Sequence, residues 1–205
     1  MDNTHTREQE KQERRQAMLD AAQEIAAVSG WSSVTIRKVA EKVQYSPGMV
    51  YEYFENKDDL LISLIREAYH HLFLLMQQAY QQEGNADDRL VVMMLAFWHF
   101  AMQKPELYQA MNGVNGIPLY RKGLLPETLQ LTELITKALS SLAAFRTDEE
   151  LADGMFIAQG TINGLAATTL SGSITGGPER GETLLEQAIR NLIIAWRVRY
   201  TLHQK

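Results

Sequence analysis

The chain has 205 residues, of which 45% are hydrophobic and none is cysteine, and its formal net charge is −5. This length and apolar content suffice for a buried core, whereas the absence of cysteine excludes disulfides and thiolate-based metal or catalytic sites. The acidic sum argues against nucleic-acid binding by the chain as a whole, so such a site needs a local concentration of Lys and Arg. Without a long apolar run or a secretory signal, we expect a cytoplasmic protein with no membrane partner.

Helical spacing of apolar residues begins in the N-terminal part of the chain. An apolar stripe among charged residues predicts a first helix over 14–28, followed by Gly30, which is suited to a helix C-cap. Thr35 is a favourable N-cap. The apolar positions after it recur every three or four residues, which predicts a second, short helix over 36–43.

A Pro-Gly pair then interrupts the helical pattern. Ser46 offers an N-cap, and the proline that follows it takes the first helical position, where its missing N–H is not needed. The pair therefore marks the start of a third helix, over 47–54. Asn56 caps the next helix, which carries acidic residues in its first turn and continues over 57–80.

The remaining chain also follows helical spacing. The segment 90–102 is almost wholly apolar, so we expect it to be buried on most sides and to end at Pro105. Glycine and proline predict a looser segment over 108–122, and a proline opens a further helix over 126–144.

The last third of the chain predicts two more helices. Thr147 begins a capping box for a helix that ends near residue 171, and a glycine-rich loop separates it from a last helix over 182–200. No strand pattern appears. We therefore predict an all-α fold with a three-helix, helix-turn-helix domain over 1–57 and a larger helical domain over 58–205.

The two short helices fit the helix-turn-helix plan, in which the second helix enters the major groove of DNA. Ala40 is small enough for the helices to cross closely. Between residues 31 and 51 the charged side chains are Arg37, Lys38 and Lys42 against the single carboxylate of Glu41. This segment is therefore locally basic although the chain is acidic, as phosphate binding requires.

The N-terminal third resembles the tetracycline-repressor (TetR) family of bacterial transcription regulators. The resemblance rests on the stretches GWSSVTIRKVA and SPGMVYEYFENKDDL. Residue types match that family's pattern at Gly30, Thr35, Ile36, Ala40, Ser46, Tyr51, Phe54, Lys57 and Leu60. The resemblance implies a homodimer that binds a palindromic operator in double-stranded DNA, with a C-terminal domain for a small-molecule effector and dimerisation. It implies neither an enzyme nor a cofactor.

The resemblance also assigns a DNA-binding set, in which cations and hydroxyls contact phosphates and the residues around Met49 read bases. The expected residues are Thr35, Arg37, Lys38, Ser46, Pro47, Gly48, Met49, Tyr51, Glu52, Tyr53 and Lys57. Gln44 departs from the family pattern because it occupies the turn position that usually holds glycine, so we expect it at positive φ. Glu52 repels phosphate unless it faces a cytosine amino group or pairs with a cation.

Methionine and aromatic residues of the C-terminal part are candidates for an apolar effector pocket, although each is also an ordinary core residue type. They are Phe73, Met94, Phe97, Trp98, Met102, Tyr108, Met111 and Tyr120. His99 lies among bulky apolar residues, where it either satisfies its nitrogens within the core or orients a ligand.

Small residues in the segment before the last loop allow close helix approach, either within the chain or in a two-fold seam with the last helix. The dimerisation residues expected are Gly160, Thr161, Gly164, Leu192 and Trp196. Glu67, His70 and His71 are spaced so that two of the three could share a helix face and bind a metal. Without a third ligand in view, the sequence predicts a solvated surface there rather than a metal site.

Two other functions fit parts of the pattern. A helical enzyme or ligand carrier would use His99 and Tyr108, although no nucleophile, phosphate loop or complete metal set accompanies them. A protein-interaction module without DNA affinity is consistent with the net charge and with Glu52. Arg14 and Arg15 stand in a mixed run with acidic residues, so we expect a solvated helix face there.

Overall fold

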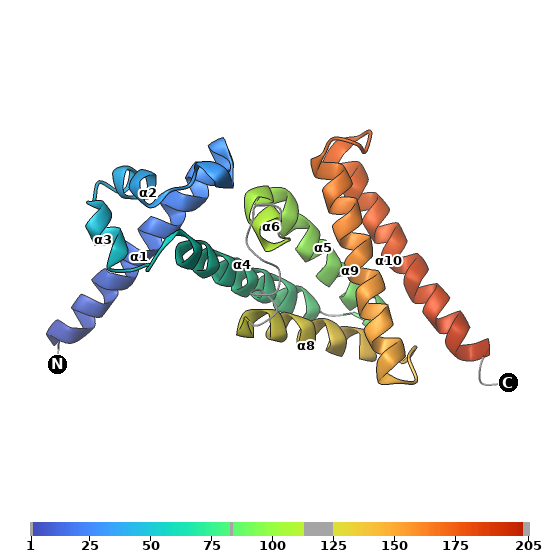
Figure 1. Ribbon diagram of the computed structural model, residues 1–205. Coiled ribbons are helices and arrows are strands. Elements are labelled where there is room, and N and C mark those ends of the chain that lie inside the picture. Colours follow the sequence, from blue (N-terminus) through green and yellow to red (C-terminus); the bar gives the residue numbers. More distant parts are fainter. Residues whose placement is uncertain (1, 83, 113–124, 203–205) are drawn as a thin grey trace. The chain divides into compact units, whose positions relative to one another are not determined.

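The computed structural model describes residues 2–82, 84–112 and 125–202, and every regular element in these ranges is a helix. The predicted all-α fold is confirmed. The helices are α1 (Asp2–Ser29), η1 (Trp31–Ser33), α2 (Ile36–Lys42), α3 (Pro47–Tyr51), α4 (Lys57–Tyr80), α5 (Ala86–Gln103), α6 (Pro105–Met111), α8 (Pro126–Ser140), α9 (Asp148–Leu170) and α10 (Gly177–Leu202) (Figure 1). Within the described ranges, no helix combines the length and apolar character needed to cross a membrane.

The helices form two compact units. The first unit comprises residues 1–68 and 106–124, and the second comprises residues 69–105 and 125–205. This division falls within α4 and groups α6 with the N-terminal helices. The domain boundary expected at residue 57 stays a prediction.

Local side-chain chemistry sets the helix starts in the first unit. Thr35, Ser46 and Asn56 each accept a hydrogen bond from the backbone N–H three residues further on, at 3.2, 3.2 and 3.0 Å. Each bond satisfies one N–H that the first helical turn leaves without a partner. Gln44 has φ 59° and Gly30 has φ 75°, so both take the left-handed conformations that the sequence predicts for them.

Several helix boundaries differ from the prediction. α1 starts at Asp2 rather than near residue 14, and α5 and α10 start at Ala86 and Gly177 rather than at 90 and 182. Apolar spacing marks only the buried part of a helix, so exposed polar turns are missed. α3 ends at Tyr51 rather than at 54. α8 ends at Ser140 rather than at 144, because the turn after it places Ala143 at φ 51°, which a helix cannot include.

The segment around α6 also differs in part from the prediction. Residues Pro105–Met111 form the helix α6, whereas the sequence predicts a looser segment from residue 108 onward. Proline closes α5 as expected and at the same time opens α6, because it is tolerated at the first helical position. The rest of the predicted looser segment lies outside the described residues.

The first unit is built around the N-terminal helices. α1 packs against η1 and α2, and α2 packs against α3. Ala40 is 1% exposed, so the small residue predicted at the crossing of α2 and α3 is buried there. Trp31 is also buried, and its Nε1 donates to the backbone oxygen of Glu106 at 2.9 Å. Gln23 of α1 donates to the carboxylate of Glu106 at 2.8 Å, so α1, η1 and α6 are joined.

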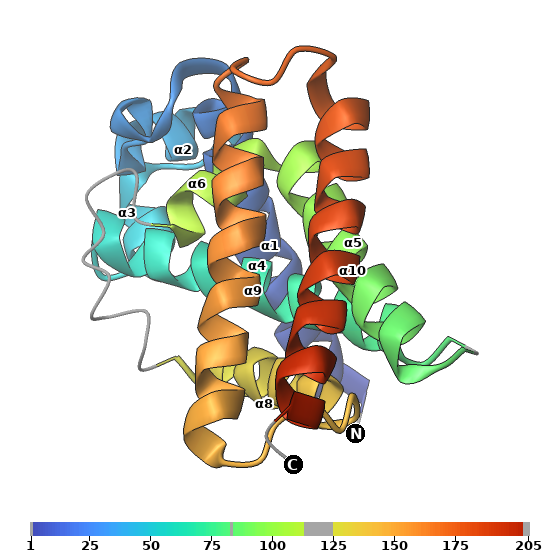
Figure 2. The ribbon, with the colours of Figure 1, turned by 90° about the vertical axis from the view of Figure 1, so that its right-hand side faces the viewer.

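The second unit is a bundle of α5, α8, α9 and α10. α9 and α10 run side by side in opposite directions, and both pack against α5, while α8 packs against α5 and α9 (Figures 1 and 2). Thr147 accepts from the N–H of Glu150 at 3.1 Å, which confirms the predicted start of α9. The N–H of Arg146 in turn donates to the Glu150 carboxylate, and this bond is the main reason that the pKa of Glu150 is lowered.

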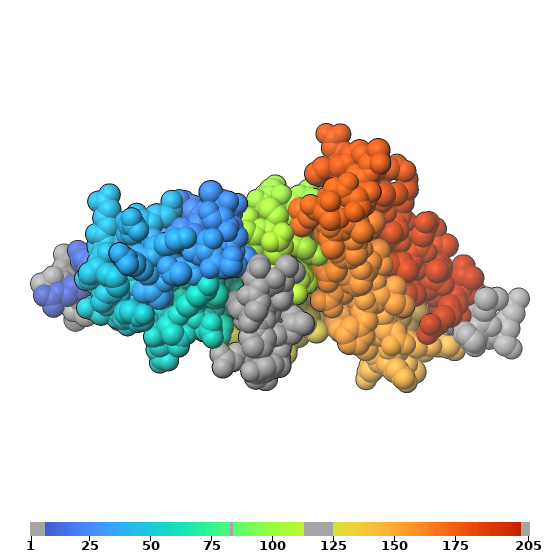
Figure 3. Space-filling view, turned by 45° about the horizontal axis from the view of Figure 1, so that its top comes forward, coloured from blue at the N-terminus to red at the C-terminus, as the bar shows by residue number. Residues whose placement is uncertain are grey.

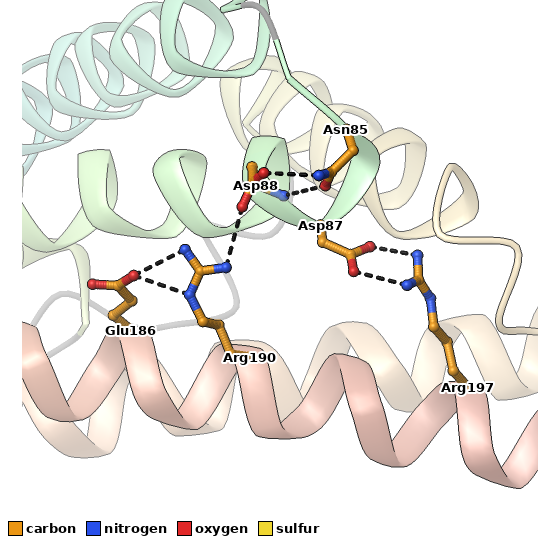
Figure 4. A network of polar contacts seen from close by, with 6 residues as sticks. All are labelled: Asn85, Asp87, Asp88, Glu186, Arg190 and Arg197. Atoms are coloured by element: carbon orange, nitrogen blue, oxygen red, sulfur yellow. Dashed lines mark hydrogen bonds and ion pairs between the residues drawn. The ribbon is translucent and has the colours of Figure 1, made fainter.

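A charged cluster fastens the start of α5 to α10 (Figure 4). Asp87 accepts two hydrogen bonds from Arg197, and Asp88 accepts one from Arg190 at 3.1 Å. Asn85 caps α5 through the N–H of Asp88 at 3.0 Å. Because these side chains are largely solvated, we assign the cluster a role in register rather than a large stabilisation.

Gly181 lies where α10 approaches its neighbours closely. A Cβ atom there would lie 2.5 Å from the buried Trp98 ring and 2.6 Å from Thr169 Oγ1. We expect Gly181→Ala to lower the free energy of unfolding by about 1–3 kcal/mol, because overpacking outweighs the better helix propensity of alanine. Denaturant unfolding measures this change. The exposed substitution Gln187→Ala on the same helix should change stability by less than about 0.5 kcal/mol, and equal stability of both variants would contradict the expectation.

Candidate nucleic-acid interface

The helix-turn-helix presents one buried and one solvated face. Ile36, Val39, Ala40 and Val50 are buried between the helices. Most of the predicted DNA-binding residues are exposed on the other face, namely Thr35, Arg37, Lys38, Ser46, Pro47, Gly48, Tyr51 and Glu52. Met49, Tyr53 and Lys57 are partly buried. In the space-filling view, the light-blue residues of this segment form a continuous surface of the first unit (Figure 3).

Arg37 and Lys38 are the cations best placed for phosphate contacts. Both are exposed, and neither has an ion-pair partner among the side chains that the structure describes. Lys42 instead pairs with Glu24 of α1 at 2.7 Å. The basic character predicted for this segment is therefore carried by the first turn of α2, where an unpaired cation can bind a phosphate without breaking an existing contact.

The hydroxyls that cap α2 and α3 can still donate hydrogen bonds to a ligand. Thr35 and Ser46 use an oxygen lone pair to accept a backbone N–H, and their hydroxyl hydrogens can still donate to a phosphate. Lys57 is more constrained. Its Nζ donates to the backbone oxygen of Trp31 at 3.1 Å, which ties the start of α4 to η1 and occupies one of three donor hydrogens.

The structure adds Tyr45 to the surface that the sequence identified. It precedes the α3 cap, and 38% of its surface is exposed. Its hydroxyl is a phosphate-binding group of the same kind as that of Tyr51, which is 56% exposed. Tyr45 could have been identified from the sequence, because it is an aromatic residue in a turn and does not fit the apolar spacing of either helix.

The comparison with known proteins agrees with this geometry. Residues 18–64 match the family model described as bacterial regulatory proteins, tetR family, which spans α2, α3 and the start of α4. A solved TetR family transcription regulator from Marinobacter aquaeolei shares the fold with a TM-score of 0.65 and 18% identity, over 90% of this chain and 97% of that one. Residues 18–64 therefore carry the DNA-binding segment of the tetR family.

The curated relatives that this chain matches are regulators rather than enzymes. The fatty acid metabolism regulator protein of Bacillus subtilis is 29% identical over 85 residues, which cover 42% of this chain and 43% of that protein. The HTH-type transcriptional repressor KstR of Mycolicibacterium smegmatis is 30% identical over 102 residues, half of each chain. This chain thus spans about half the length of the curated relatives that it matches.

A likeness in fold extends to the C-terminal helices. A protein of unknown function from a Rhodococcus species has a TM-score of 0.74 at 18% identity, over 86% of this chain and 93% of that one.

The predicted effector residues Met94, Phe97 and Trp98 are buried in the second unit, whereas Phe73 and Met102 are partly buried there. Tyr108 and Met111 are buried in the first unit, and burial raises the pKa of Tyr108. Tyr120 lies outside the described residues.

His99 departs from its expected place among bulky apolar groups. Its side chain is 51% exposed, and its Nε2 lies 3.1 Å from the carboxylate of Glu182. It lines an open hollow of about 370 Å³ on α4 and α5 rather than the core. The reason is helical geometry: Leu90, Met94, Phe97 and Ala101 mark the buried face of α5, and His99 lies on the opposite side of the helix.

The predicted dimerisation residues divide into two groups. Gly160 and Gly164 are exposed, and nothing lies within 4 Å of a Cβ atom built at either position. Trp196, expected to supply bulk to a two-fold seam, is instead 7% exposed and packs on Phe145 with ring centroids 5.3 Å apart. Leu192 is partly buried and Thr161 likewise. Because it packs on Phe145, the indole of Trp196 stabilises the helical bundle of its own chain.

Glu67 has a structural partner that the sequence did not suggest. Its carboxylate accepts from Arg15 at 3.0 Å and from Gln16 at 3.1 Å, which joins α4 to α1. The Arg15 guanidinium also lies 5.3 Å from the centre of the Phe54 ring. Within the described ranges, no three His, Asp or Glu side chains gather as a metal site would require.

Proposed function

We propose that this chain is a ligand-responsive transcription regulator, and specifically a repressor, that binds a palindromic operator as a homodimer. The observation that carries the proposal is the solvated face of α2 and α3. There, two capped helix starts, the exposed hydroxyls of Tyr45 and Tyr51, and the unpaired cations Arg37 and Lys38 occur together. The match of residues 18–64 to the tetR family and the regulators among the chain's relatives support this reading.

The outer face of α9 and α10 supports dimerisation. Four large apolar side chains are solvated there: Phe156 at 64%, Ile157 at 46%, Ile194 at 61% and Val198 at 52% exposure. Such a group is uncommon on a monomer surface and typical of an interaction site. The exposed glycines of α9 leave room for a second helix to approach closely, and a two-fold interface pairs the same surface with itself.

The proposed effector is a small apolar or aromatic molecule, because the second unit is rich in methionine and aromatic side chains that adapt to such ligands. We further propose that it acts by shifting the orientation of α4, a single continuous helix that contributes to both units. Such a shift would change the spacing of the two recognition helices in a dimer. A ligand that stabilises the protein yet leaves DNA affinity unchanged would contradict this coupling.

Selection of genomic duplexes by the purified chain tests the DNA-binding proposal. Recovery is compared at about 50 mM and about 200 mM salt, because phosphate contacts make binding strongly salt-dependent. We expect a single palindromic sequence, retained better at the lower salt. Recovery of no duplex at either salt, with and without small molecules that stabilise the protein, would favour an interaction module without DNA affinity.

A further inference from the structure

The first turns of α1 gather three basic side chains on one face. The sequence run from Arg7 to Gln16 contains no apolar residue and alternates acids with bases. Once the run is helical, Arg7, Lys11 and Arg14 lie within about 60° of one another around the axis, whereas Glu13 lies on another side. A sequence that reads as a mixed charge run therefore forms a basic stripe.

The basic stripe faces the end of the recognition helix. Arg7, Lys11 and Arg14 line an open hollow of about 340 Å³ whose other wall includes Tyr53, the second residue after α3. α1 extends past α3 at its N-terminal end (Figure 1). Cations and a tyrosine hydroxyl thus share one solvated hollow, and these are the side-chain types that bind nucleic-acid phosphates.

The hollow also contains two carboxylates, Glu10 and Glu52. Glu10 lies 3.5 Å from Arg14, and both side chains are about half exposed, at 54% and 44%. Arg7 and Lys11 have no ion-pair or hydrogen-bond partner among the side chains that the structure describes. The three cations outnumber the two acids, and the two cations without partners bind an anion at no cost to an existing pair.

The chemistry of the stripe selects the partner. Insertion into a bilayer or binding in an apolar protein groove would require apolar side chains on this part of α1, and residues 7–16 have none. The stripe spans about 10 Å along α1, because seven residues rise about 1.5 Å each. That length is enough to reach more than one backbone phosphate of a duplex.

We propose that Arg7, Lys11 and Arg14 bind backbone phosphates of the duplex beside the segment that α3 contacts, with Tyr53 as a neighbouring donor. This inference rests on the proposed DNA-binding function and extends it to α1. The contact is sequence-independent, because it involves no base edge. It increases affinity for every duplex that is long enough to reach the stripe.

The test uses the full chain and a duplex that the wild-type protein has selected from a random pool, with Arg7→Ala/Lys11→Ala as the variant. Removing two phosphate-binding cations from each subunit of a dimer should lower the log–log salt slope by roughly 4, at about 0.9 per phosphate. The preferred sequence should not change. The control Lys104→Ala/Arg180→Ala removes the same charge from exposed positions of the second unit and should leave the slope unchanged.

A second variant makes the test independent of any loss of folding. Glu10→Gln removes the carboxylate beside Arg14, so it should increase affinity and steepen the salt dependence. An unchanged salt slope in the folded double variant, or an unchanged affinity and slope in Glu10→Gln, overturns the role of α1 while the proposed regulator function stands. Failure of the wild-type chain to bind any duplex overturns both.

Discussion

Replacing Arg37 and Lys38 together by alanine should weaken binding to the selected duplex by about 1,000-fold or more at low salt. The substitutions remove four charge-assisted phosphate bonds from a dimer, each contributing on the order of 1 kcal/mol or more. The log–log salt slope should fall by roughly 4. Stability should change little, because both side chains are exposed and the Thr35 cap bonds only the backbone of residue 38.

Fluorescence anisotropy across a salt series measures both effects. The Lys104→Ala/Arg180→Ala control keeps the same net charge as the variant, so a general electrostatic effect would appear in both proteins. If the variant and the control bind with the same slope, then the first turn of α2 does not contact phosphate. In that event the recognition surface would have to be sought elsewhere on the first unit.

Substitutions on the outer face of α9 and α10 should have the second large effect, a loss of dimerisation and of affinity for the palindrome. Phe156→Asp combined with Ile194→Asp should convert the proposed dimer to a monomer, because each subunit would place two charges in an apolar two-fold interface. Affinity for the palindrome should then fall by about 100- to 10,000-fold, toward that of one half-site, since the linked second binding event no longer occurs. The fold should survive, because both residues are more than half exposed.

Sedimentation velocity and anisotropy on the same samples separate assembly from DNA binding. The control Gln130→Asp/Thr132→Asp adds two acids to exposed positions of α8 and should leave both the mass and the affinity unchanged. A variant that still sediments as a dimer would place the interface on another surface. A monomer that binds the palindrome as tightly as the wild-type chain would show that dimerisation does not contribute to operator affinity.

Local chemistry explains why the two helices of the helix-turn-helix, α2 and α3, could be predicted. A capping side chain bonds an N–H three residues away, so Thr35 and Ser46 define their helix starts whatever surrounds them. Gln44 belongs to the same group, since a turn between two short helices requires a left-handed residue. Arg37 and Lys38 lie opposite the buried residues of α2, so their exposure follows from helical spacing.

Residues whose surroundings come from distant segments could not be predicted. The apolar neighbours of His99 in sequence suggested burial, yet His99 lies on the side of α5 opposite the face that packs against other helices, and it is exposed. Trp196 has the size and spacing of an interface residue, but Phe145 from the turn before α9 covers it. Lys57 carries a charge suited to phosphate, and its bond to Trp31 is visible only once η1 is placed beside α4.

The sequence by itself determined the all-α class, the caps that begin α2 and α3, and the locally basic first turn of α2, because these depend on interactions within a few residues. Only the tertiary structure decided which exposed residues of different helices lie side by side, and with it the hollow that the basic stripe of α1 shares with Tyr53 and the apolar outer face of α9 and α10. The physical reason is that helical spacing separates the faces of a single helix, whereas the neighbours of each face come from distant segments of the chain.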